Sequence, residues 1–189
     1  MSFAVVMSSA ALLARCGGGN GLTSPASVDN VLRSYSVYAM TGSSSSLPAA
    51  YQYTTESLVR PQVLSNGTLN FDIAFDLTTD GKVRLLPARY LVPLPPAGAP
   101  TIGLQRMTTP FASLARAPLN GYQADSAATI SVGETFTLEL RDSGCNFGEF
   151  FYAKITVDSV FVNERRMVMR SLVNRNCGYR SLTEGLPKD

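Results

Sequence analysis

The C-terminal third of the chain carries two apolar runs separated by a polar break. Residues 154–158 alternate between polar and apolar side chains, which is the period-two pattern of a half-buried strand. Apolar residues resume over 167–173 after the polar group at 163–166, so the pattern predicts a β-hairpin that turns there. Because both faces are apolar near the turn, we expect the hairpin to lie centrally in a sheet.

Two cysteines frame this hairpin. Cys145 precedes the first strand and Cys177 follows the second, so antiparallel pairing would bring their thiols within reach of each other. We predict a disulfide, which in the chain-entropy model stabilises the fold by about 3–4 kcal/mol. The alternative is a pair of reduced cysteines.

The most regular alternation occurs over residues 69–77, LNFDIAFDL. Its odd-numbered residues are apolar and are predicted to face the core, while its even-numbered residues are predicted to form a solubilising outer face. Asp72 and Asp76 on that face would lie about 13 Å apart along one strand, which is too far for a pair of glycosidase carboxylates.

A turn at Gly81 connects this strand to the next. A three-residue loop with Gly81 in the left-handed conformation pairs Leu77 with Val83 and keeps the apolar faces together. This register also predicts a structural cross-strand pair between Asp76 and Arg84 on the outer face.

Further short strands with turn residues between them are predicted along the rest of the chain. They cover residues 35–40, parts of 51–63, and residues 101–107, 127–130 and 134–140. Seven to nine such strands predict an all-β fold, a two-sheet antiparallel β-sandwich. The segment VGETFTLEL resembles strands of immunoglobulin-like and transthyretin-like sandwiches, and this resemblance implies a fold of that type.

A proline-rich excursion interrupts the strands. Residues 92–100 hold four prolines and are predicted to cross the surface, and Thr109-Pro110 predicts a short helix that runs to about Arg116. We regard this excursion as a candidate partner surface, with a lid over the sandwich edge as the alternative. The candidate residues are Pro93, Pro95, Pro96, Met107, Phe111, Leu114 and Arg116.

The N-terminal residues 3–14 form an apolar segment of the length of a secretory signal core. It ends in Leu13-Ala14-Arg15-Cys16, which resembles the lipobox of bacterial lipoproteins. The resemblance implies that residues 1–15 are a signal peptide and that Cys16 carries lipid, which would anchor the protein on the extracytoplasmic side, in the periplasm or at the outer membrane. The alternative is a buried helix with an unmodified cysteine.

These boundaries predict one domain. A flexible tether is expected over 16–27, a single β-sandwich over 28–182, and a polar tail over 183–189. Without Arg15 the chain has 15 Lys and Arg against 14 Asp and Glu, a net charge of +1, so no nucleic-acid partner is expected.

The composition restricts the available chemistry. The chain contains no histidine, which removes Ser-His-Asp and Cys-His nucleophilic sites and histidine-based metal sites. No catalytic residue, metal site or cofactor is predicted, and Met167 and Met169 are interpreted as core residues rather than copper ligands. Tryptophan is also absent, although the eight tyrosines offer aromatic surfaces for a ligand.

The sequence therefore favours a non-enzymatic, lipid-anchored extracytoplasmic protein that binds or scaffolds. One alternative is an accessory structural subunit that stabilises a larger respiratory, photosynthetic or transport complex at the membrane. Another is a carbohydrate- or peptide-binding module, and a hydrolase is the least favoured class. A flat apolar patch near 92–121 would favour the subunit, and a concave pocket lined by tyrosines and carboxylates would favour the ligand-binding module.

Overall fold

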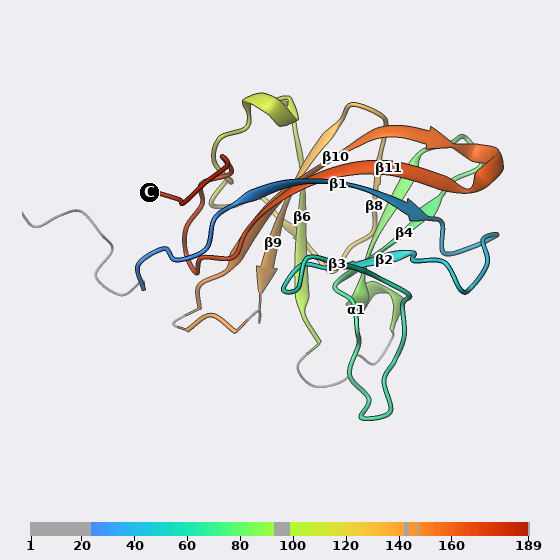
Figure 1. Cartoon of the computed structure of the whole chain (residues 1–189), viewed down its shortest axis with the longest axis horizontal. Helices are drawn as coiled ribbons and strands as arrows, with labels where there is room; N and C mark the ends of the chain where they lie inside the picture. The colour runs from blue at the N-terminus through green and yellow to red at the C-terminus, as the bar shows by residue number, and fades with distance from the viewer. Residues whose placement is uncertain (1–23, 93–98, 142–143, 147, 189) are drawn as a thin grey trace, which may run out of the picture.

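The computed structural model describes residues 24–92, 99–141, 144–146 and 148–188. Two antiparallel sheets form a sandwich (Figure 1), which confirms the predicted all-β architecture. In spatial order, the six-stranded sheet comprises β1 (Val31–Tyr38), β11 (Arg166–Asn174), β10 (Phe151–Phe161), β9 (Thr135–Arg141), β6 (Thr101–Met107) and β7 (Gln123–Ala124). The five-stranded sheet comprises β3 (Ser57–Val59), β2 (Ala50–Gln52), β4 (Ile73–Leu77), β5 (Val83–Pro87) and β8 (Ala128–Ile130).

The predicted central hairpin is β10 and β11. β10 pairs with β9 on one side and β11 pairs with β1 on the other, so neither strand lies at a sheet edge. The 3₁₀ turn η2 (Val162–Glu164) connects them, and Arg165 closes the turn with a left-handed φ of 51°. Met167 and Met169 are fully buried in the core between the sheets, as predicted.

The β4–β5 hairpin has the predicted register, with Leu77 opposite Val83 and Asp76 opposite Arg84. Gly81 has a φ of 77°, the left-handed conformation that the three-residue loop requires. The predicted ion pair is wrong, however, because the Asp76 carboxylate pairs with Arg165 at 3.0 Å instead of with Arg84.

The predicted solubilising face of residues 69–77 is also wrong. Asp72 and Asp76 are only 5% and 4% exposed, and β4 is buried on both faces. A small apolar cluster covers the second face; it comprises Ala50, Phe71, Ala74, Leu86 and Ala88. The alternation predicted that residues 69–72 belong to the same strand, but β4 begins only at Ile73. Phe71, which was predicted to face the main core, packs in this second cluster instead.

Several other boundaries differ from those predicted. β1 begins at Val31 and ends at Tyr38, whereas the predicted strand was 35–40. The helix expected after Thr109-Pro110 is a single 3₁₀ turn, η1 (Phe111–Ser113), without a side-chain N-cap, because the backbone is already extended at Leu114. The one-turn helix α1 (Ala88–Leu91) was not predicted. Within the described part of the chain, no helix has the length and apolar character needed to cross a membrane.

Candidate functional site

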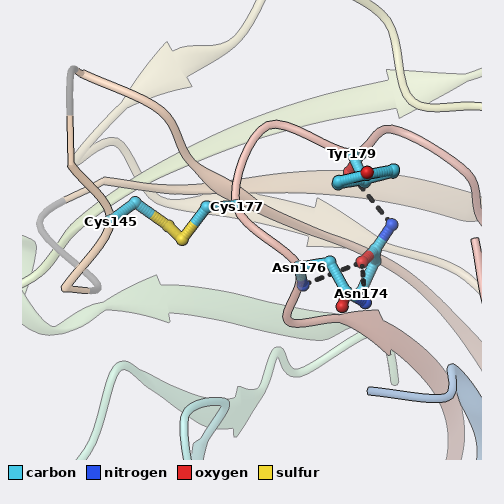
Figure 2. The surroundings of a disulfide bond; sticks show 5 residues. All are labelled: Cys145, Asn174, Asn176, Cys177 and Tyr179. Atoms are coloured by element: carbon cyan, nitrogen blue, oxygen red, sulfur yellow. Dashed lines mark hydrogen bonds between the residues drawn. A yellow bond between two sulfur atoms is a disulfide. The ribbon is translucent and has the colours of Figure 1, made fainter. Parts of the chain in front are cut away.

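Cys145 and Cys177 form the predicted disulfide (Figure 2), with their Cα atoms 5.5 Å apart. Cys145 precedes β10 and Cys177 follows β11, so the bond closes the open end of the central hairpin. The predicted lipidation residue, Cys16, lies outside the described residues.

Beside the disulfide, asparagine side chains hold the start of the described chain. Asn176 Oδ1 accepts hydrogen bonds from the backbone N–H groups of Ser27 and Val28 at 2.8 and 3.0 Å, and Asn176 Nδ2 donates to Val28 O at 2.8 Å. Asn174 Oδ1 in turn accepts from Asn176 N and Nδ2, both at 3.0 Å (Figure 2). Residues 27 and 28 are thus attached to the same end of the sandwich that the disulfide closes.

The segment predicted as a polar tail also contacts this end. Asn30 Nδ2 donates to the carbonyl of Thr183 at 3.0 Å, and the backbones of Asn30 and Gly185 form a bridge. The two ends of the described chain therefore lie close together (Figure 1).

The candidate partner surface is divided by the structure. Pro93, Pro95 and Pro96 lie outside the described residues. Phe111 and Leu114 are 7% and 6% exposed and pack in a cluster on the outer face of the six-stranded sheet; the other members are Ala117, Tyr152, Leu172 and Leu182. Met107 is partly buried against this cluster, and Arg116 is exposed. The described apolar side chains of the excursion thus cover the outer face of the six-stranded sheet, whereas the predicted lid lay over the sandwich edge. We call this cover, residues 111–117, the lid.

A buried lysine holds this lid in place. Lys154 Nζ on β10 donates to the carbonyl oxygens of Phe111 and Leu114, both at 2.9 Å, and lies 4.6 Å from the centre of the Phe111 ring. Lys154 is 5% exposed, and burial lowers the pKa of its amine. Contacts within the chain therefore account for the buried position of this ammonium group.

A concave pocket of about 380 Å³ opens between β1 and the β2–β3 hairpin. It is lined by Leu32, Arg33, Ser34, Tyr35, Tyr51, Glu56 and Leu58. Two tyrosines and a carboxylate in one concavity are the feature expected of a ligand-binding module. This site could not be identified from the sequence, because its residues come from β1, β2, β3 and the turn at Glu56, and the local pattern does not predict how these segments meet.

Tyr35 and Tyr51 form a compact cluster in the wall of the pocket, together with Tyr53 behind them. The rings of Tyr35 and Tyr51 stack with centres 4.9 Å apart, and Tyr53 meets Tyr51 edge-on at 4.8 Å. Their three hydroxyl groups and that of Ser171 are buried, and none forms a hydrogen bond of ordinary geometry with another described residue. Buried polar groups nearly always have a partner, so these four hydroxyls form an unusual polar centre inside the sandwich.

Burial controls the protonation of this cluster. It raises the pKa of Tyr51 to about 12 and also raises the pKa values of Tyr35 and Tyr53 well above the ordinary value, although the nearby Ser171 hydroxyl lowers those of Tyr35 and Tyr51 in part. The phenols therefore stay protonated at neutral pH, so they act as hydrogen-bonding groups and not as bases.

Glu56 brings a carboxylate to the wall of the pocket. Its side chain is only 4% exposed and forms ion pairs with Arg33 and with Arg175, the latter at 3.1 Å. Glu56 also has a φ of 52°, a conformation that non-glycine residues rarely adopt and that is found disproportionately at functional sites. Two guanidinium groups against one carboxylate leave one net positive charge at this rim.

A larger groove of about 660 Å³ lies at the other end of β1, between Met40, Phe71 and Leu91. Its lining is mostly apolar, with Arg60 as the one charged residue among those described there. The groove borders Val92, the last described residue before 93–98, so we assign no site to it.

We call the concavity between β1 and the β2–β3 hairpin the tyrosine pocket. It offers a ligand the partly buried ring of Tyr35, the apolar Leu32 and Leu58, and a net positive charge. The described residues contain no group of three or more acidic, cysteine or histidine side chains placed to bind a metal ion. Comparisons of this chain with known protein families, curated proteins and solved structures found no match.

Proposed function

We propose that this chain is a non-enzymatic binding protein, held at the extracytoplasmic face of a bacterial membrane by a lipid on Cys16. The pocket between β1 and the β2–β3 hairpin binds its ligand. The observation that carries this proposal is the concavity formed by Tyr35, Tyr51 and Glu56, in which aromatic rings and a nearly buried carboxylate converge. Such convergence of apolar walls with a few fixed polar groups is characteristic of ligand sites.

The export and anchoring parts of the proposal are supported by the lipobox-like Leu13-Ala14-Arg15-Cys16 and by the disulfide. Disulfides persist in oxidising compartments and are uncommon in the cytosol. Mass spectrometry of the native N-terminus tests the anchor: we expect a lipid-modified Cys16, and an intact unmodified Met1 would contradict it.

The binding part is tested by site-specific photo-crosslinking in the producing cell. A photoreactive benzoylphenylalanine replaces Leu58, which lines the pocket, or Val132, an exposed control residue that does not line it. We expect a discrete adduct of defined mass from position 58 and none from position 132. If both positions give the same adducts, or neither gives one, the pocket does not bind a ligand in the cell.

A further inference from the structure

The edge strand β1 has backbone groups that face away from β11, the one strand with which it pairs in the described part of the chain. Ala39 N, just after β1, donates to Arg165 O at 2.7 Å, in register with the β1–β11 ladder. Backbone groups in an antiparallel ladder alternate in direction, so those of odd-numbered β1 residues face β11 and those of even-numbered residues face away. Tyr38 N fits this assignment, because it donates to Pro48 O on the other side at 2.9 Å.

A central window of this edge is unpaired. Asn30 exchanges two backbone hydrogen bonds with Gly185 at the start of β1, and Tyr38 is paired at its end. Between them, the outward backbone groups of Leu32, Ser34 and Ser36 have no hydrogen-bond partner among the described residues. The window spans five residues, or about 16 Å of strand.

This edge lacks the features that usually block strand addition. β1 contains no proline, its register with β11 is continuous, and Leu32, Ser34 and Ser36 are all exposed. Its one charged side chain, Arg33, is directed to Glu56. A long and regular edge whose single charged side chain is paired with Glu56 is a template for another strand.

The tyrosine pocket lies directly beside this window. Arg33 and Tyr35 alternate with the unpaired residues and line the pocket, so a strand added to β1 would direct every second side chain toward it. Because Arg33 and Arg175 outweigh Glu56 in charge at the rim, an acidic side chain is the best complement there.

We propose that the ligand is an extended segment of a partner protein, which adds to β1 as a further strand and places an acidic side chain over the tyrosine pocket. This inference rests on the proposed function and specifies the class of ligand. Backbone hydrogen bonds to Leu32, Ser34 and Ser36 provide affinity, and the pocket selects the side chain.

The test uses the full-length chain in mild detergent and linear nonapeptides selected from a random phage-displayed library. Affinity for the synthetic peptide is measured by fluorescence anisotropy for wild type, Ser34→Pro and Ser34→Ala. Proline removes an outward N–H that β11 does not use, whereas alanine changes the side chain and keeps that N–H. We expect binding at least about tenfold weaker for Ser34→Pro and little changed for Ser34→Ala.

A second measurement keeps the test decisive if Ser34→Pro does not fold. Single N-methyl groups are placed along the peptide, and we expect affinity to fall at every second position, because only alternate N–H groups of an added strand face β1. If peptide affinity falls without this alternation, or if Ser34→Pro and Ser34→Ala bind the peptide equally well, the proposal of strand addition is wrong. Weaker binding after replacing a peptide Asp or Glu by its amide supports the charge assignment.

Two further assays separate this inference from the proposed function. If cello-, chito- or malto-oligosaccharides bind in a way that depends on Glu56 but not on Ser34, the ligand is a carbohydrate and only the peptide inference fails. If sedimentation shows dimers that Ser34→Pro dissociates, β1 pairs with a second copy instead. If neither peptides nor oligosaccharides bind and position 58 gives no photo-adduct, the proposed function fails as well.

Discussion

The Arg165 guanidinium lies 3.0 Å from the Asp76 carboxylate and connects the turn of the central hairpin to β4 in the opposite sheet. Arg165 Nε also donates to Thr41 O at 3.1 Å, and the Thr41 hydroxyl donates to Asp76 at 2.8 Å. Three segments far apart in the sequence therefore meet at one nearly buried carboxylate. The left-handed backbone at Arg165 directs the chain into this contact.

Removing the guanidinium should leave the Asp76 charge buried without its ion-pair partner. We expect Arg165→Met to lower the free energy of unfolding by about 2–4 kcal/mol, since breaking a buried ion pair on one side is strongly destabilising. Arg84→Met is the matched control, because Arg84 faces Asp76 in the register but is not its ion-pair partner in the described structure, and it should cost less than about 0.5 kcal/mol. Equal losses in urea unfolding would show that the Arg165–Asp76 pair is not a main contributor.

The disulfide should contribute to stability through the loop that it closes. Cys145 and Cys177 are 32 residues apart, for which the chain-entropy model gives about 3–4 kcal/mol. Replacing both cysteines with serine should lower the unfolding free energy by this amount, and reductant should have the same effect on wild type. Reductant should not affect the double variant, which serves as the control. A wild type whose urea midpoint is unchanged by reductant would contradict this contribution.

The parts of the fold that could be predicted from sequence are those specified by local alternation. β6 matches its predicted range, and Phe136, Leu138 and Leu140 of β9 face the core because one face of that strand is consistently apolar. The register of the β4–β5 hairpin could also be predicted from local sequence, since the turn at Gly81 determined the pairing of Leu77 with Val83.

Burial of polar residues could not be predicted in the same way. Asp72 and Asp76 alternate with apolar residues as surface residues would, but segments distant in the sequence cover them. The tyrosine pocket could not be predicted for the same reason. Tyr35, Tyr51 and Glu56 meet only when β1 and the β2–β3 hairpin approach from different sheets. The many tyrosines were a compositional signal, but their spacing did not indicate which of them would converge.

The lid over the six-stranded sheet should depend on Lys154. Replacing this residue with methionine keeps an apolar stem but leaves the carbonyl groups of Phe111 and Leu114 without their donor. We expect a loss of about 1–3 kcal/mol and faster amide hydrogen exchange over residues 111–117. Lys82→Met, at an exposed ion pair, should leave both quantities nearly unchanged. Unchanged exchange over 111–117 in Lys154→Met would mean that apolar packing alone holds the lid.

Asp72 should make stability depend on pH in the mildly acidic range. Burial raises the pKa of its carboxyl to about 6, although the backbone N–H groups of Tyr53 and Thr54 oppose this rise; Tyr53 N lies 2.6 Å from Asp72 Oδ2. The folded protein therefore binds this proton more tightly than the unfolded chain. The resulting stability is fully present below the unfolded pKa of about 4 and is lost as the pH rises through about 6.

The variant Asp72→Asn removes this titration while keeping an amide oxygen that can accept from Tyr53 N. Between pH 4 and pH 7.5, the difference in unfolding free energy between wild type and variant should therefore shift by up to about 3 kcal/mol, with wild type gaining on acidification. Urea unfolding at several pH values measures this difference, in which contributions from the other carboxyl groups largely cancel because both proteins share them. A constant difference across the range would show that Asp72 titrates alike in the folded and unfolded chains, and that its buried position does not penalise its charge.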